Sequence, residues 1–187
     1  MDSSGWKEMA LLASGVGLAG WAGWLDWRSR KIPNWLTVPA LAAGLLVRAA
    51  LAGWPGTKAG LGGAGISLGV LLPFVVMGGL GAGDWKLMGA LGAFLGPPQT
   101  VVVLLGTVLI AGLMSVVEVI RHRRVRETLH NLWVIFVAYS TFRLGSARLI
   151  TLDNPGLLRI PFGVAAAIST GLLFVGTVVI RLFAKSG

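Results

Sequence analysis

The chain has 187 residues, of which 55% are hydrophobic and only 12% carry a charged side chain. A soluble domain carries about 25% charged residues, so this chain has too little polar surface to cover a globule in water. The composition excludes a large soluble domain and predicts an all-α membrane bundle with roughly five to seven spans. The formal net charge of +9 does not indicate nucleic-acid binding, because the basic residues cluster between apolar segments, where topology determinants lie.

The absence of cysteine and the low number of histidines limit the possible chemistry further. The chain has no cysteine, which excludes disulfides, thiol catalysis and cysteine-ligated zinc, and its two histidines are too few for a histidine metal centre. We therefore expect no metal and no cofactor. The first apolar stretch lacks a basic leader, and Arg28, Arg30 and Lys31 follow it where a small-residue cleavage site would be needed. This pattern predicts a retained span rather than a signal peptide.

Six apolar segments are predicted to form the spans of a single domain, residues 1–187. The first ends at Asp26, and Pro33 suits the entry to the second because its missing N–H needs no helical partner there. The third is rich in glycine, which lets helix backbones approach closely in lipid. The fourth is short, so it is expected to tilt or to cross only part of the bilayer. The approximate bounds are 9–25, 35–53, 61–80, 85–95, 100–120 and 160–183.

Residues 121–159 are predicted to form a cytoplasmic basic loop. Its densest charge run, residues 121–126, is either a docking surface for anionic lipid or an assembly partner, or an anchor that fixes topology, and we favour the anchor. The apolar stretch 132–139 is too short to span. It is predicted to be a helix that lies at the interface or packs on the bundle.

The distribution of basic residues predicts the orientation. If the first span exits into the cytoplasm, eleven of the sixteen lysines and arginines lie on the cytoplasmic side, as the positive-inside rule requires. Both termini are then outside, and Asp26 and Asp84 are at the cytoplasmic face. The cytoplasmic set is Arg28, Arg30, Lys31, Lys86, Arg121, Arg123, Arg124, Arg126, Arg143, Arg148 and Arg159.

Asp26 and Asp84 stand at the ends of apolar segments on the same predicted side. A carboxylate beside a bilayer is costly and therefore indicates a functional site. Taken singly, Asp26 could mark a helix end and Asp84 could be a helix N-cap. Together they predict an acid–base pair, because two neighbouring carboxylates cannot both ionise cheaply and one can act as base while the other stays protonated. Gly81 and Gly83 allow close backbone approach, and Lys86 should point to a different helix face from Asp84.

Three segments resemble the prepilin peptidases, a family of aspartyl proteases with a Gly-x-Gly-Asp motif. Residues 26–37, Asp-Trp-Arg-Ser-Arg-Lys-Ile-Pro-Asn-Trp-Leu-Thr, resemble the first catalytic segment of that family. Residues 81–87, Gly-Ala-Gly-Asp-Trp-Lys-Leu, are similar to the second. Residues 160–165, Ile-Pro-Phe-Gly-Val-Ala, resemble the Pro-Phe-Gly opening of the last helix.

The resemblance implies an aspartic endopeptidase of the bacterial inner membrane. Such an enzyme cleaves the short basic leader from type IV prepilins and pseudopilins at the cytoplasmic face. Asp26 and Asp84 would be the catalytic pair, and Gly81 and Gly83 would shape the site. The remaining motif positions, without assigned roles, are Arg28, Pro33, Asn34 and Lys86.

The chain departs from the longer relatives, which carry a cysteine-containing zinc region associated with methylation of the new N-terminus. It therefore resembles the short form of tight-adherence (Flp-type) pilus systems, and we expect no N-methyltransferase activity. A pilus, type II or tight-adherence secretion assembly is the expected partner, besides the lipid bilayer. Two alternatives are a small proton-coupled transporter and a non-enzymatic secretion scaffold. Acids at the membrane edge argue against the transporter, since carriers bind cargo near the midplane.

Overall fold

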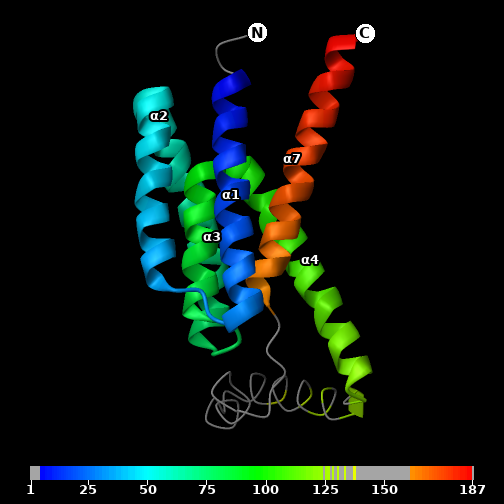
Figure 1. Cartoon of the computed structure of the whole chain (residues 1–187). Coiled ribbons are helices and arrows are strands. Elements are labelled where there is room, and N and C mark those ends of the chain that lie inside the picture. Colours follow the sequence, from blue (N-terminus) through cyan, green and yellow to red (C-terminus); the bar gives the residue numbers. More distant parts are fainter. Residues whose placement is uncertain are drawn as a thin grey trace.

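The computed structural model describes residues 5–123 and 161–186, with single positions at 125, 126, 128, 130, 133 and 137. The regular structure of this part of the chain is helical, as predicted (Figure 1). The helices are α1 (Gly5–Ser29), α2 (Asn34–Val76), α3 (Ala82–Leu95), α4 (Pro97–Arg121) and α7 (Phe162–Ser186). The predicted loop 121–159 and its short helix 132–139 lie largely outside the described residues.

α2 turns back on itself at Gly53. The backbone there leaves the helical conformation, with φ 60° and ψ −144°, which glycine adopts at low cost because it has no Cβ. The two halves, 34–52 and 54–76, lie side by side, since a Cβ added at Gly60 would meet Leu45 Cδ2 at 3.0 Å. The break at Gly53 coincides with the end of the second predicted apolar segment, 35–53.

α3 is the most deeply buried helix of the described bundle, and each of its residues from Leu87 to Leu95 is buried. It packs against the second half of α2 so closely that Gly63 and Gly92 touch. A Cβ on either glycine would collide with the carbonyl oxygen of the other. The glycine-rich composition of the third predicted span therefore serves this contact, as small residues do between membrane helices.

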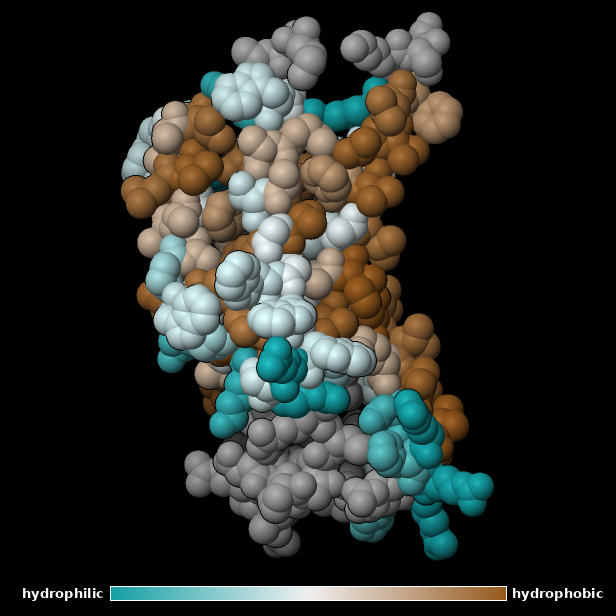
Figure 2. Space-filling view, in the orientation of Figure 1, coloured by the Kyte–Doolittle hydropathy of each residue, from teal (hydrophilic) through white to brown (hydrophobic). Residues whose placement is uncertain are grey.

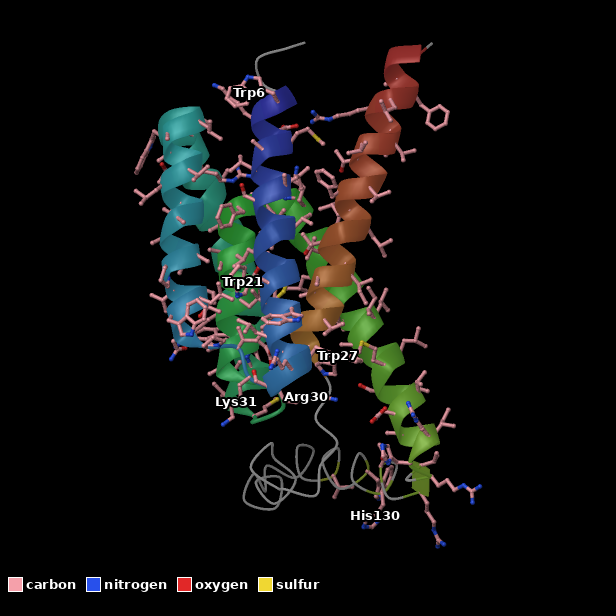
Figure 3. All side chains as sticks on the ribbon, viewed as in Figure 1. Trp6, Trp21, Trp27, Arg30, Lys31 and His130 are labelled. Atoms are coloured by element: carbon pink, nitrogen blue, oxygen red, sulfur yellow. The ribbon has the colours of Figure 1, made fainter. Side chains whose placement is uncertain are left out.

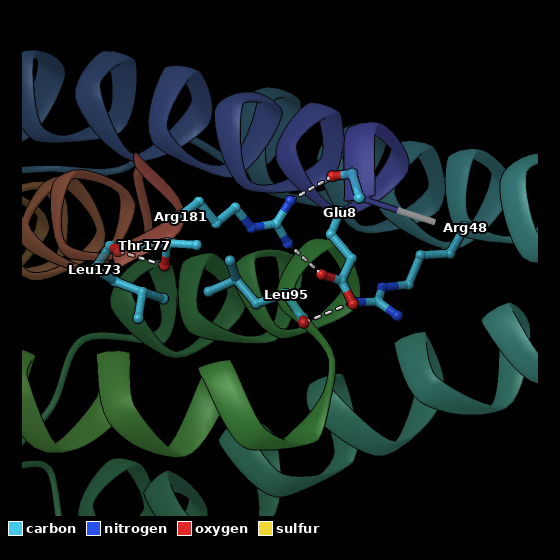
Figure 4. Close-up of polar contacts among 7 residues, drawn as sticks. Glu8, Arg48, Leu95, Leu173, Thr177 and Arg181 are labelled. Atoms are coloured by element: carbon cyan, nitrogen blue, oxygen red, sulfur yellow. Dashed lines mark hydrogen bonds and ion pairs between the residues drawn. The ribbon is translucent and has the colours of Figure 1, made fainter. Parts of the chain in front are cut away.

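The C-terminal end of α3 is capped by a side chain from α2. Arg48 donates from Nε to the Phe94 carbonyl oxygen at 3.0 Å. Its Nη2 donates to the Leu95 carbonyl oxygen at 2.6 Å (Figure 4). The last carbonyls of a helix have no partner within it, and an unpaired carbonyl is costly in an apolar medium. Arg48 thus satisfies the C-terminal carbonyl oxygens of this 14-residue helix.

α1 and α7 are joined at both of their ends. Near the chain termini, Arg181 donates to Glu8 Oε2 at 2.6 Å and to the Gly5 carbonyl oxygen at 2.7 Å (Figure 4). At the other end, a Cβ added at Gly23 would meet the Gly163 carbonyl oxygen at 3.0 Å. α7 also crosses α4, where Ser169 Oγ donates to the Val103 carbonyl oxygen at 3.0 Å. The end of α1 and the start of α7 are therefore held together.

The surface of the described bundle suits a lipid environment. Large apolar side chains are exposed along α4 and α7, and apolar colour covers much of the face in Figure 2. Among the described residues, three helices are long and apolar enough to cross a membrane: α2, α4 and residues 162–184 of α7. α1 and α3 are not among them, because α1 is rich in glycine, alanine and tryptophan and α3 has only 14 residues. A helical membrane protein is confirmed, while six spans and the sidedness of the termini stay predictions.

Candidate active site

Asp26 continues the buried face of α1. Along that face Ala19, Ala22 and Gly23 are buried, and Asp26 follows at helical spacing with only 5% of its surface exposed. Its Oδ2 accepts a hydrogen bond from the Gly163 backbone N–H at 2.8 Å. The helix thus carries a carboxylate into a closely packed contact with the first turn of α7.

Asp84 lies in the first turn of α3. Gly81 precedes that helix in an extended conformation, so Asp84 is the third helical residue and not the N-cap. A backbone hydrogen bond from Gly81 reaches its carboxylate. An acid at this position that reaches back to the N-cap amide is half of a capping box, which explains why the helix begins at Ala82 rather than at Trp85.

Ile32 separates α3 from α7 and closes one side of the site. A Cβ added at Gly83 would lie 2.7 Å from the Ile32 carbonyl oxygen, and one added at Gly163 would lie 3.0 Å from Ile32 Cδ1. Ile32 itself is buried. The link between α1 and α2 is therefore packed between the two helix starts that contact the aspartates.

The two carboxyls interact electrostatically. Both aspartates lie just outside the apolar segments that are predicted to span, 9–25 and 85–95. Burial raises the pKa of Asp84 to about 7, and the negative charge of Asp26 adds to the rise. Burial also raises the pKa of Asp26, but the Gly163 N–H and the positive charge of Arg30 oppose that rise. Two carboxyls that interact in this way titrate as a unit.

Lys86 and Asn34 lie at the same end of the bundle and contact each other. Lys86 Nζ donates to Asn34 Oδ1 at 3.0 Å, which joins the start of α3 to the start of α2. The lysine side chain is thus directed to α2 and not to Asp84, as its helical position predicted. Pro33 precedes α2 as the N-cap residue, and its carbonyl oxygen accepts from the amides of Leu36 and Thr37.

Arg28 is placed differently from the other predicted site residues. It is exposed on α1, and its guanidinium carbon lies 5.7 Å from the centroid of the Trp24 ring. Two residues apart on a helix, Arg28 and Asp26 face nearly opposite sides. Figure 3 shows the neighbouring Trp27, Arg30 and Lys31 at the same end of α1. Arg28 therefore belongs to the outer basic surface of this end.

Gly163 and Ile32 contact the site but were not predicted to do so. Gly163 acts through a backbone amide, and Ile32 acts through its bulk, so neither has a side chain that signals chemistry. Their only sequence signal was membership of the two segments that resemble a known family. In the described part of the chain, no three His, Asp or Glu side chains gather closely enough to hold a metal ion.

Comparison with known proteins gives one result. A family model described as "Type IV leader peptidase family" matches residues 13–116, which include Asp26, Asp84 and both motif glycines. No curated protein and no solved structure matched the chain. The match ends before α7, so the contact from Gly163 lies outside the matched region.

Proposed function

The chain belongs to the type IV leader peptidase family, and we propose that it is a membrane aspartyl endopeptidase that removes the basic leader of type IV prepilins or pseudopilins. The observation that supports this proposal is the placement of Asp26 and Asp84 at one end of the bundle, where the helix starts at Gly83 and Gly163 both pack against Ile32. The two aspartates come from different helices, and the negative charge of Asp26 contributes to the raised pKa of Asp84. A carboxylate beside a protonated carboxyl is the arrangement that activates water for attack on a peptide bond.

The reaction follows from the chemistry of the pair. The ionised aspartate takes a proton from water while the water oxygen bonds to the carbonyl carbon of the scissile peptide. The protonated aspartate gives its proton to the carbonyl oxygen, which forms a neutral tetrahedral intermediate. Collapse of this intermediate breaks the C–N bond, and a proton passes to the leaving amine. The products are the free leader and a pilin with a new N-terminus.

We propose six spans, with both termini outside and the aspartates at the cytoplasmic face of the bacterial inner membrane. The spans would be α1, the two halves of α2, α3, α4 and α7. Two observations support this arrangement. The basic residues gather on the proposed cytoplasmic side, and the ends of α1 and α7 that lie near the termini meet through Arg181 and Glu8.

The proposed substrate is a prepilin of the tight-adherence (Flp) type. The proposed partner is the secretion assembly of that pilus system. Support comes from the lack of cysteine in these 187 residues, which supplies no ligand for a cysteine-bound zinc like that of the longer relatives. We propose cleavage without N-methylation for the same reason. A substrate whose leader is followed by an apolar helix would present its scissile bond near the cytoplasmic headgroups, close to the proposed depth of the aspartates.

Co-expression with a Flp-type prepilin from the same genome tests the proposal. Wild type should shorten the pilin by the length of its leader, while Asp26→Asn and Asp84→Asn should not, although both remain in the membrane. Glu118→Gln is the matched control, because Glu118 lies on α4 beside His122 and away from the pair. Shortening that survives both aspartate substitutions would assign the cleavage to another protease and refute the proposal.

A further inference from the structure

The start of α7 is occupied by the carboxylate of Asp26. The first amides of a helix have no partner within it and carry a partial positive charge. Pro161 precedes α7 and offers no side-chain acceptor, although its carbonyl oxygen accepts from the Val164 amide. Asp26 supplies the missing acceptor from another helix through its bond to the Gly163 N–H. A carboxylate so placed is stabilised in its ionised form.

The contact requires glycine at position 163. A Cβ built there would lie 3.0 Å from Asp26 Cβ, 3.1 Å from Asp26 Oδ2 and 3.0 Å from Ile32 Cδ1. These distances are too short for ordinary packing, so any larger residue would push the carboxylate away from the amide. The backbone of α7 and the side chain of Ile32 therefore fix where the Asp26 carboxylate lies.

The charges around the two aspartates differ. The Asp26 carboxylate lies at the start of α7 and the Asp84 carboxylate at the start of α3, and each accepts a backbone N–H, so these features do not distinguish them. Arg30, which follows α1, places a positive charge near Asp26, whereas the charge that acts on Asp84 is the negative one of Asp26. The other nearby cation, Lys86 of α3, is bonded to Asn34 of α2. On α7, Arg181 lies near the far end of the helix.

We propose that Gly163 is the positioning residue of the pair, holding Asp26 as the ionised carboxylate that accepts the proton of water and leaving Asp84 as the acid that protonates the carbonyl oxygen. The inference rests on the proposed peptidase function and assigns the two roles within it. Asp26 and Asp84 are the catalytic residues, and Gly163 acts through Asp26.

Gly163→Ala tests the positioning role, with Gly171→Ala as the matched control in the same helix. A Cβ at Gly171 would meet nothing within 4 Å, so this control should cleave the leader like wild type. Gly163→Ala should cleave about 10- to 100-fold more slowly, since a misplacement of about 1 Å has an effect of that size. The acid limb of its pH–rate profile should move to higher pH, because a base that has lost a donor ionises less readily. Adding Ile32→Val to Gly163→Ala should restore part of the rate, because the loss of Ile32 Cδ1 makes room for the new Cβ at position 163.

An unchanged rate and an unchanged acid limb in folded Gly163→Ala would overturn the proposal. A second measurement on the wild-type fold keeps the proposal testable if that variant fails to fold. Phe162–Gly163 is the only Phe-Gly pair in the sequence, so carbonyl-¹³C phenylalanine with ¹⁵N glycine isolates the Gly163 amide in an NMR spectrum of the detergent-solubilised protein.

The Gly163 amide proton should resonate downfield, titrate with Asp26 and move upfield in Asp26→Asn. If the chemical shift of the Gly163 amide proton did not change in Asp26→Asn, the positioning role would be overturned, even in an active peptidase. Conversely, a titrating amide in a protein that cleaves no leader would refute the peptidase function and leave the contact standing. The two failures are thus distinguishable.

Discussion

The carboxylates at the two ends of the bundle have opposite surroundings. Near the chain termini, Glu8 is 58% exposed and pairs with the Arg181 guanidinium at 2.6 Å. At the other end, Asp26 and Asp84 are withdrawn from water and act on each other as like charges. The first arrangement neutralises an acid and ties helices together. The second raises the pKa of both carboxyls, as the proposed acid–base role of the pair requires.

The sharpest test of this comparison replaces one acid at each end by its amide. Asp84→Asn should reduce leader cleavage by about 10³-fold or more, because general acid–base catalysis contributes factors of this order. Glu8→Gln should leave the rate within about twofold of wild type. Cleavage rates of the purified proteins at matched concentration measure both. An inactive Glu8→Gln that remains folded would show that the two ends are not separate in function.

The capping arginine should matter more for stability than the ion pair does. Arg48→Met would leave the Phe94 and Leu95 carbonyl oxygens without this donor, at a cost of about 2–4 kcal/mol. Arg48→Lys should recover part of the loss, because an ammonium can reach one carbonyl but cannot bind both as a guanidinium does. Thermal unfolding in detergent measures both variants. Equal unfolding temperatures for wild type and Arg48→Met would show that the cap is not needed.

The aspartate end should make stability depend on pH. The pKa of Asp84 is about 7 in the folded protein and near 3.8 when exposed, so the folded state binds the proton more tightly. The contribution of Asp84 to the free energy of unfolding should therefore be fully present below about pH 4 and should decline as the pH rises through 7. Because Asp84 is only partly buried, we expect a loss of roughly 1–3 kcal/mol. Unfolding temperatures measured from pH 5 to 8 should fall for wild type and flatten in Asp84→Asn.

The smallest effect is expected from the exposed ion pair at the other end. Arg181→Gln removes the cation that pairs with Glu8 and should lower the free energy of unfolding by about 1 kcal/mol or less. The difference from wild type should shrink in high salt, which screens exposed charges. A loss larger than that of Arg48→Met, unchanged by salt, would contradict the ranking of these contacts.

The sequence indicates the candidate catalytic residues more clearly than it indicates the groups that contact them. Asp26 and Asp84 are visible as charges at the edges of apolar segments, and the structure brings them to one end. Gly163 is not visible in this way, because a backbone amide looks the same at every position and only the packing of α7 on α1 makes it a donor. The start of α3 was missed by three residues, because the capping role of Asp84 depends on its reach to Gly81.

The number of spans is harder to predict from the sequence than the helical class. Apolar runs do predict helices, and the bundle confirms that class. However, the fold-back at Gly53 joins two expected spans into α2, and α3 is stabilised by burial within the protein and by Arg48 rather than by its own length. Such support from neighbouring helices is absent from a local hydropathy pattern.

The bond between Asp26 and Gly163 also has a consequence for biosynthesis. Its two partners lie 137 residues apart in the chain. A nascent protein that has emerged as far as α4 already contains both aspartates but not the amide that holds the first. Because translation runs from the N-terminus, the contact to Asp26 forms only when α7 has entered the bundle. The order of synthesis therefore delays this geometry until α7 has been made.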